Sequence, residues 1–376
     1  MSLGTEFWDA LKEGLHDSDD QFVKQVIPTG CPPIDRALGG MPDQGGFGTG
    51  RIHEIFGDWS TGKTAILYLW LISTQLRGGQ AGLDEAEGGF EAEWYRSMGG
   101  VFEKGNPQSL RVNPECRTVE EFFDKRTTLV KKLKKVANPP LVAWGLDSIA
   151  ALGTEKLEKE GLGGSRDMTK AFLMDQGTKR LIGHIYGLPI AFLGTNQTRK
   201  VVGAQPWEPT HTPGGRAWPY FSSTRIELKL DGGPKGHLIL HDGEGIGRWV
   251  RGTVIKNKQA PPFRVFKVPI YNESGFPHPE FENELTLKGV DVDESLLEFY
   301  LGNKRATWGE DAQPYMQQAG PKVRLHAELF PDAATFYRRE WKKVLEEYPH
   351  LRNYKPEDPI RPPKPKPTVK KKARKK

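Results

Sequence analysis

Eight residues of this chain, Gly57-Asp58-Trp59-Ser60-Thr61-Gly62-Lys63-Thr64, have the spacing G-x-x-x-x-G-K-T of a phosphate-binding loop. The two glycines permit a tight turn whose N–H groups point at phosphate oxygens. Lys63 would reach the β- and γ-phosphates, and the Thr64 hydroxyl would ligate Mg²⁺. A short apolar strand precedes the loop at 52–56, and an apolar helix follows it at 65–72, as such a loop requires. The sequence therefore predicts a nucleoside triphosphate site.

Two further apolar runs end in acidic residues. The run 141–148 ends at Asp147, which is the Walker B arrangement of a strand-end carboxylate in the Mg²⁺ shell. The segment 80–90 predicts a strand that ends among Asp84, Glu85 and Glu87. A carboxylate at such a strand end can polarise the water that attacks the γ-phosphate. Ordinary solvation at the surface is the alternative for any one of these acids.

Two glycine-rich segments with basic residues, 155–167 and 198–215, flank a predicted helix at 169–183 and a strand at 188–195. The first is predicted to be a mobile loop. Long loops in compact domains are uncommon unless they are functional. Basic loops at one edge of a sheet suit a phosphate-backbone ligand. Simple surface connections remain the alternative.

Charge and composition narrow the protein class. The net charge of +6 arises in the tail, because 351–376 holds eleven Lys or Arg and two acids, a net of +9, which leaves 6 − 9 = −3 for the rest. No run approaches eighteen apolar residues, so we expect no membrane span. We also expect no secretory signal. The two cysteines lie far apart, which predicts a reduced cytosolic compartment without structural zinc.

The chain divides into four predicted parts. Residues 1–26 form an N-terminal arm with a short amphipathic helix at 6–15, which docks on its own domain or on an adjacent subunit. Residues 27–278 form the nucleotide-binding core, with antiparallel strands at 224–230 and 236–240 and another strand at 249–257. Residues 279–350 form a small C-terminal domain. Residues 351–376 form a disordered basic tail, rich in Pro and Lys.

From about residue 27 to 263 the sequence resembles the bacterial-type RecA recombinase family. The matching blocks keep their order along the chain. They are Pro28-Thr29-Gly30 through Gly39, Gly50-Arg51-Ile52 into the phosphate loop, Glu85-Ala86-Glu87, Leu146-Asp147-Ser148-Ile149-Ala150-Ala151-Leu152, Asn196-Gln197-Thr198-Arg199, Pro213-Gly214-Gly215 and Val254-Ile255-Lys256-Asn257-Lys258. The last block is particular to the bacterial-type branch.

This resemblance implies roles for individual positions. Glu87 falls on the catalytic glutamate, and Gln197 on a glutamine that senses the γ-phosphate and relays to a DNA loop. Trp94 falls on the aromatic residue that stacks on adenine, and Glu91 on the acid near its amino group. Lys256 and Lys258 fall on lysines that reach the neighbouring subunit's ATP.

The resemblance also implies two DNA-binding loops, 155–167 and 198–213. The residues we assign to DNA binding are Arg166, Lys179, Arg199, Lys200, Gly214 and Gly215. The chain departs from the family in a shorter N-terminal region, an expanded turn at 41–49, an Asp84-Glu85 pair in place of an apolar-acid pair, no arginine near Phe172, and a basic tail where an acidic one is typical. These differences suggest a divergent or phage-borne member.

The sequence thus predicts an α/β fold, a RecA-like P-loop ATPase core with a mostly parallel central sheet. The expected function is an ATP- and Mg²⁺-dependent recombinase that forms a filament on single-stranded DNA, also binds double-stranded DNA, and acts in the cytoplasm with the nucleoid. A hexameric RecA-fold helicase or motor, or a recombination mediator that binds ATP without strong turnover, are the alternatives. A metabolic P-loop kinase fits less well, because no arginine-rich lid is visible.

Overall fold

The computed structural model describes residues 25–39, 45–160, 168–199, 211–232, 236–279, 285–291 and 295. The predicted arm helix at 6–15, most of the C-terminal domain 279–350 and the tail 351–376 lie outside these residues. So do Arg166 and Lys200, which belong to the two predicted DNA loops.

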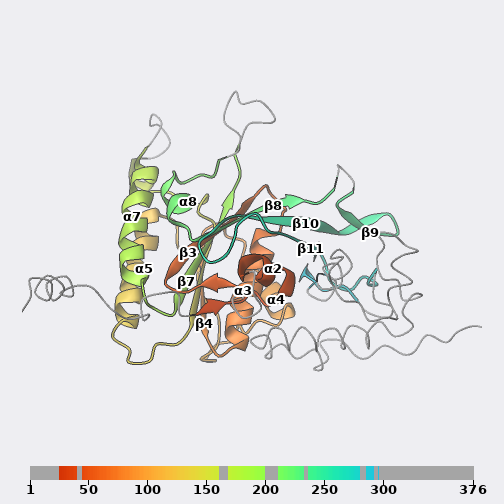
Figure 1. Ribbon diagram of the computed structural model, residues 1–376, viewed down its shortest axis with the longest axis horizontal. Coiled ribbons are helices and arrows are strands. Elements are labelled where there is room, and N and C mark those ends of the chain that lie inside the picture. The colour runs from red at the N-terminus through yellow and green to blue at the C-terminus, as the bar shows by residue number, and fades with distance from the viewer. Residues whose placement is uncertain are drawn as a thin grey trace, which may run out of the picture.

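A ten-stranded sheet forms the centre of the described chain, in the order β12-β11-β10-β8-β3-β7-β6-β4-β5, with β9 paired to β10 beside this path (Figure 1). The strands β8, β3, β7, β6, β4 and β5 run parallel to one another, whereas the pairs β8–β10, β10–β9, β10–β11 and β11–β12 are antiparallel. The mostly parallel α/β sheet predicted from the sequence is therefore confirmed. The strands are β3 (Arg51–Gly57), β4 (Gln80–Glu85), β5 (Arg111–Asn113), β6 (Val142–Asp147), β7 (Ile190–Gln197), β8 (Thr224–Leu230), β9 (Leu238–His241), β10 (Glu244–Asn257), β11 (Val265–Tyr271) and β12 (Gly289–Val290).

Helices cover both faces of the sheet, as parallel strands require. Figure 1 shows α5 and α7 side by side against one face, and α2, α3 and α4 against the other. Each face has its own core, one built around α3 and the other around α5 and α7. The helices are α2 (Pro32–Gly39), α3 (Lys63–Leu76), α4 (Ala92–Ser97), α5 (Val119–Leu133), α6 (Glu155–Glu160), α7 (Thr169–Ile185) and α8 (Ala217–Phe221). Two short strands, β1 (Val26–Ile27) and β2 (Phe47–Gly48), form a separate pair.

The phosphate loop joins β3 to α3, as its sequence predicts. The residues of α3 from Ala65 to Gln75 are buried, because this helix packs on the sheet and shares one core with α2 and α4. Gly62 precedes the helix with φ of 80°, in the left-handed region that favours glycine. A Cβ at this position would lie 2.0 Å from Cδ1 of Ile270, so side-chain packing also requires glycine here.

The structure differs from the sequence prediction at several boundaries. The first residues of the predicted loop 155–167 form α6, a helix from Glu155 to Glu160. Its i,i+4 pair, Lys159 with Glu155, favours a helix locally. The strand predicted at 249–257 begins earlier, at Glu244, and pairs with both β8 and β9. The sheet also continues beyond residue 278, because β12 pairs with β11.

Candidate nucleotide site and DNA-facing loops

The phosphate loop positions Lys63 at the first turn of α3. Its Nζ donates to the carbonyl oxygens of Gly57 (3.1 Å) and Asp58 (2.7 Å). Burial lowers the pKa of Lys63, while the nearby carboxylates of Asp147 and Glu87 act in the opposite direction. An ammonium group that gives up two carbonyl partners can bind phosphate oxygens at little further desolvation cost, since it is already largely dehydrated. The loop residues therefore suit a triphosphate.

Thr64 and Asp147 meet where α3 begins and β6 ends. Thr64 Oγ1 donates to Asp147 Oδ2 at 2.7 Å, and Thr195 Oγ1 donates to Asp147 Oδ1. Burial raises the pKa of Asp147 to about 6, despite both hydrogen bonds. A hydroxyl and a carboxylate are the hard oxygen donors that Mg²⁺ prefers. These two side chains, together with waters and phosphate oxygens, fit a Mg²⁺ site.

Glu87 lies just beyond β4 and has partners at the ends of two other strands, β6 and β7. Its Oε1 accepts a hydrogen bond from Ser148 Oγ, which follows β6, and lies 3.4 Å from Gln197 Nε2 at the end of β7. The structure therefore brings together Glu87 and Gln197, which the resemblance assigned to catalysis and to γ-phosphate sensing. The sequence reasoning gave no role to Ser148, although its position after Asp147 was a usable signal.

The two acids before Glu87 face other partners. Glu85 accepts from the backbone N–H groups of Glu87 and Gly89, each at 3.0 Å, and so shapes the turn. Asp84 points to the other side of β4, where it accepts from Trp144 Nε1 at 2.7 Å and pairs with Arg126. Neither arrangement leaves these acids as free as Glu87 to orient a water at the phosphate loop.

The second predicted DNA loop leaves the sheet directly beside this site. Thr198 Oγ1 donates to Asp58 Oδ1 in the phosphate loop. Arg199 and His211 exchange backbone hydrogen bonds of 2.9 and 3.1 Å, which closes the base of the loop. Gly214 and Gly215 follow with φ of 93° and 79°, conformations that glycine adopts readily. The start and end of this loop are thus fixed close to the nucleotide site.

A comparison with protein families and curated proteins agrees with this geometry. Residues 12–277 match the model of the RecA N-terminal domain. The chain is 33% identical to Protein RecA of Rhodopirellula baltica over 319 residues, which cover 84% of this chain and 76% of the relative. It is 30% identical to Protein RecA of Thermus thermophilus over 347 residues, 92% of each chain. The chain belongs to the RecA family.

The adenine-binding residues implied by the family have a different partner in this structure. Lys288 Nζ pairs with Glu91 at 2.6 Å and lies 4.8 Å from the centre of the Trp94 ring. Trp94 Nε1 donates to the Lys288 carbonyl at 3.1 Å, and its ring contacts Tyr68 at 4.9 Å. An adenine stacked on Trp94 would have to displace the Lys288 side chain. The adenine-binding roles of Glu91 and Trp94 remain predictions.

The two lysines of the family's last block lie at the end of β10. Lys256 Nζ donates to the carbonyls of Pro219 and Tyr220 at the end of α8. Burial lowers its pKa, and repulsion from Lys258 and Arg225 lowers it further. The strand ends at Asn257, so Lys258 lies just beyond it, and the register shifts between Val254 and Lys256. The two charges nevertheless lie close enough to repel each other.

The described basic residues near the loops differ in their surroundings. Lys179 is exposed on α7 and pairs with Asp175 one turn away at 2.6 Å. Lys170, to which the sequence reasoning gave no role, donates to the carbonyls of Ile149 and Ala150, each at 3.0 Å. Burial, and then repulsion from Arg199, lowers the pKa of Lys170 to about 8. A lysine at the start of the helix that follows a glycine-rich loop was the available signal.

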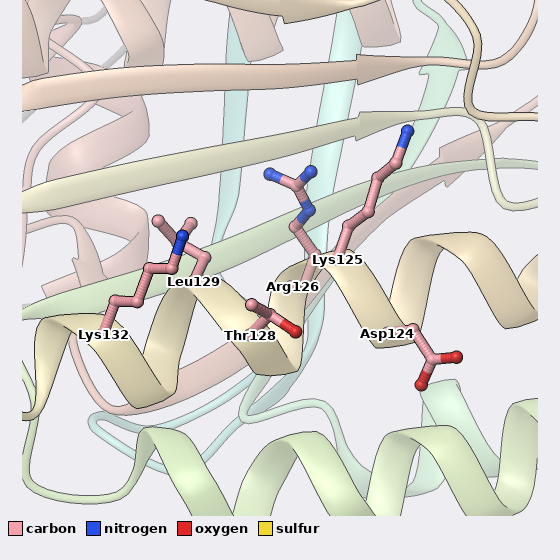
Figure 2. Close-up of a pocket in the computed structure, with 6 residues that line it drawn as sticks. All are labelled: Asp124, Lys125, Arg126, Thr128, Leu129 and Lys132. Atoms are coloured by element: carbon pink, nitrogen blue, oxygen red, sulfur yellow. The ribbon is translucent and has the colours of Figure 1, made fainter.

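An open pocket of about 440 Å³ lies along α5. Figure 2 shows Lys125 and Arg126 pointing from α5 toward the strands, whereas Asp124 points away from them. None of the residues that line the pocket belongs to the nucleotide site. Within the described part of the RecA-family core, no helix is long and apolar enough to cross a membrane.

Proposed function

We propose that this RecA-family chain is a DNA-dependent ATPase that assembles into helical filaments on single-stranded DNA and catalyses homologous pairing and strand exchange. Membership of the family supports the general class, a recombinase that uses ATP. One observation carries the finer proposal. The Glu87–Gln197 pair joins the nucleotide site directly to the loop closed by Arg199 and His211. A conformational change in this loop on DNA binding would be transmitted to Glu87 through Gln197.

In this mechanism Glu87 orients and deprotonates the attacking water, held by Ser148 and Gln197. Lys63 leaves its carbonyl partners to neutralise the charge that develops on the β- and γ-phosphates. Mg²⁺, bound by Thr64 and through water by Asp147, would polarise the phosphoryl oxygens. Hydrogen bonds from neutral partners hold Glu87 and Asp147 in place, so these two carboxylates need little reorganisation during the reaction.

Lys256 and Lys258 would complete the site of the adjacent subunit in the filament. Their side chains lie at the far end of β10, away from their own phosphate loop in the strand order β10-β8-β3. Cations supplied by a neighbour contribute on the order of a thousandfold or more to phosphoryl transfer in other P-loop enzymes. Only a correctly spaced filament would bring them into range, which explains stimulation by DNA.

The test compares ATP hydrolysis with and without single-stranded DNA, with electron-microscopic imaging of the same samples. We expect hydrolysis to rise strongly with DNA, and filaments to appear. Closed rings that unwind a forked duplex would instead identify a hexameric helicase. Turnover near zero under both conditions would identify an ATP-binding mediator.

A mixing experiment tests the shared site. Glu87→Gln and Lys256→Ala/Lys258→Ala proteins should each be inactive alone. Mixed filaments should regain activity, because some interfaces then pair an intact Glu87 with a neighbour's intact lysines. If co-filaments form without activity, the lysines do not act between subunits.

A further inference from the structure

A buried carboxylate in the middle of the sheet joins the base of the second loop to the cationic end of β10. Glu54, on β3, is 0% exposed. Its Oε1 accepts from Asn196 Nδ2 at 3.0 Å, and its Oε2 accepts from Arg225 Nε at 2.6 Å. Asn196 and Arg225 lie on β7 and β8, the strands on either side of β3. The two oxygens of one carboxylate therefore bridge three strands.

On one side, the Asn196 amide contacts both the loop and the catalytic region. Its Nδ2 also donates to the carbonyl of Pro213 at 3.1 Å, at the end of the second loop. Its Oδ1 accepts from the backbone N–H of Gln197 at 3.0 Å. A displacement of Pro213 would thus strengthen or weaken the hydrogen bond from Asn196 Nδ2 to Glu54.

On the other side, Arg225 lies beside Lys256. The two residues are partners across the β8–β10 pair. The Arg225 guanidinium lies over the Phe56 ring, 4.6 Å from its centre, which restricts its movement. The charges of Arg225 and Glu54 act in opposite directions on the pKa of Lys256, so Lys256 responds to this ion pair.

We propose that Glu54 is a positioning residue that transmits the state of the second loop, through Asn196 and Arg225, to Lys256. This proposal rests on the proposed function, because it assumes that the loop binds DNA and that Lys256 serves the neighbouring subunit's ATP. Few other arrangements are open to the Glu54 carboxylate. A buried carboxylate must keep its hydrogen bonds and its countercharge, so a change at one oxygen is compensated at the other.

Linkage gives the proposal two readouts. Stimulation of hydrolysis by DNA is a kinetic readout, to which reciprocity does not apply. Binding is reciprocal: if DNA raises the affinity for ATP through Glu54, then ATP must raise the affinity for DNA by the same factor. Coupling of this kind typically amounts to about 5- to 150-fold. Glu54→Gln keeps the shape and one acceptor oxygen but removes the charge that balances Arg225 and Lys256.

The experiment uses the full chain and compares wild type with Glu54→Gln. We expect ATP binding and hydrolysis without DNA to stay within about twofold of wild type, because Glu54 does not contact the nucleotide site. Stimulation of hydrolysis by single-stranded DNA should fall by about tenfold. The tightening of DNA binding by a non-hydrolysable ATP analogue should also be lost.

Asp84→Asn provides a matched control. Asp84 on β4 and Arg126 on α5 also form a buried ion pair, 3.2 Å apart, with side chains 0% and 9% exposed, compared with 0% and 18% for Glu54 and Arg225. Both variants should lower the melting temperature. Only Glu54→Gln should reduce stimulation by DNA. An equal loss of DNA stimulation in both variants would show a general effect of lowered stability. That result would refute the transmission through Glu54.

The remaining outcomes are distinct. A wild-type protein that DNA does not stimulate would refute the proposed function itself. A stimulated wild type with normally stimulated Glu54→Gln would refute only the relay. If Glu54→Gln does not fold, the double variant Glu54→Gln/Arg225→Gln replaces the ion pair by two neutral amides, and retained stimulation in that variant equally refutes the relay.

Discussion

The buried carboxylate of Asp147 should make the metal-free protein less stable while it serves the nucleotide site. Its pKa of about 6 lies above the ordinary value of 3.8, chiefly because burial disfavours the charged form. Since the neutral form is favoured in the fold, the contribution of Asp147 to stability is greatest at low pH and falls as pH rises from 3.8 through about 6. Asp147→Asn removes this charge.

The size of this effect on stability follows from the shift in the pKa of Asp147. About two pKa units correspond to roughly 3 kcal/mol at pH 8, and to about half of that at pH 5. Asparagine offers one oxygen, so it loses an acceptor for either Thr64 or Thr195, which costs about 1 kcal/mol. We therefore expect Asp147→Asn to stabilise the metal-free protein by about 2 kcal/mol at pH 8. At roughly 2 °C per kcal/mol, the melting temperature should rise by about 4 °C.

The assay is thermal unfolding of wild type and Asp147→Asn in a chelator, at pH 8 and pH 5, and again with Mg²⁺ and ATP. The stabilisation should be several-fold smaller at pH 5. Mg²⁺ with ATP should stabilise wild type and stabilise the variant much less, because the carboxylate that orders the metal shell is missing. An Asp147→Asn protein that is less stable than wild type at pH 8 would refute the assigned cost of burying this charge. Equal stabilisation of both by Mg²⁺ and ATP would refute the metal role.

Three further predictions concern single features of the chain. Lys63→Ala should weaken ATP binding at least tenfold, since it removes a charge that faces two phosphates; calorimetric titration measures this. Glu87→Gln should bind ATP and DNA normally yet lose most turnover, and normal hydrolysis would refute the role of Glu87 as the base. Truncation after His350 removes eleven basic residues, so DNA affinity at low salt should fall and its salt dependence should flatten. An unchanged salt slope would support a solubilising or targeting tail instead.

Much of the candidate nucleotide site could be predicted from sequence, because its parts are local. The phosphate loop carries its own geometry in two glycines, and the apolar runs around it specify the strand and the buried helix. The acid at the end of 142–147 likewise follows from one strand. Parallel strands end at the same edge of a sheet, so these local signals were enough to place Thr64 and Asp147 together.

The order of the strands cannot be predicted from these local patterns. That order determines which residues far apart in the sequence become neighbours. In the sequence, Glu54 is one of two polar residues in the predicted strand at 52–56. Only the placement of β3 between β7 and β8 gives it Asn196 and Arg225 as partners, 142 and 171 positions away. Lys288 reaches Trp94 across 194 positions for the same reason. Contacts of such separation depend on which strands become neighbours, which the whole core determines. The sequence alone determined the chemistry at the phosphate loop, and the tertiary structure decided which distant side chains are coupled to it.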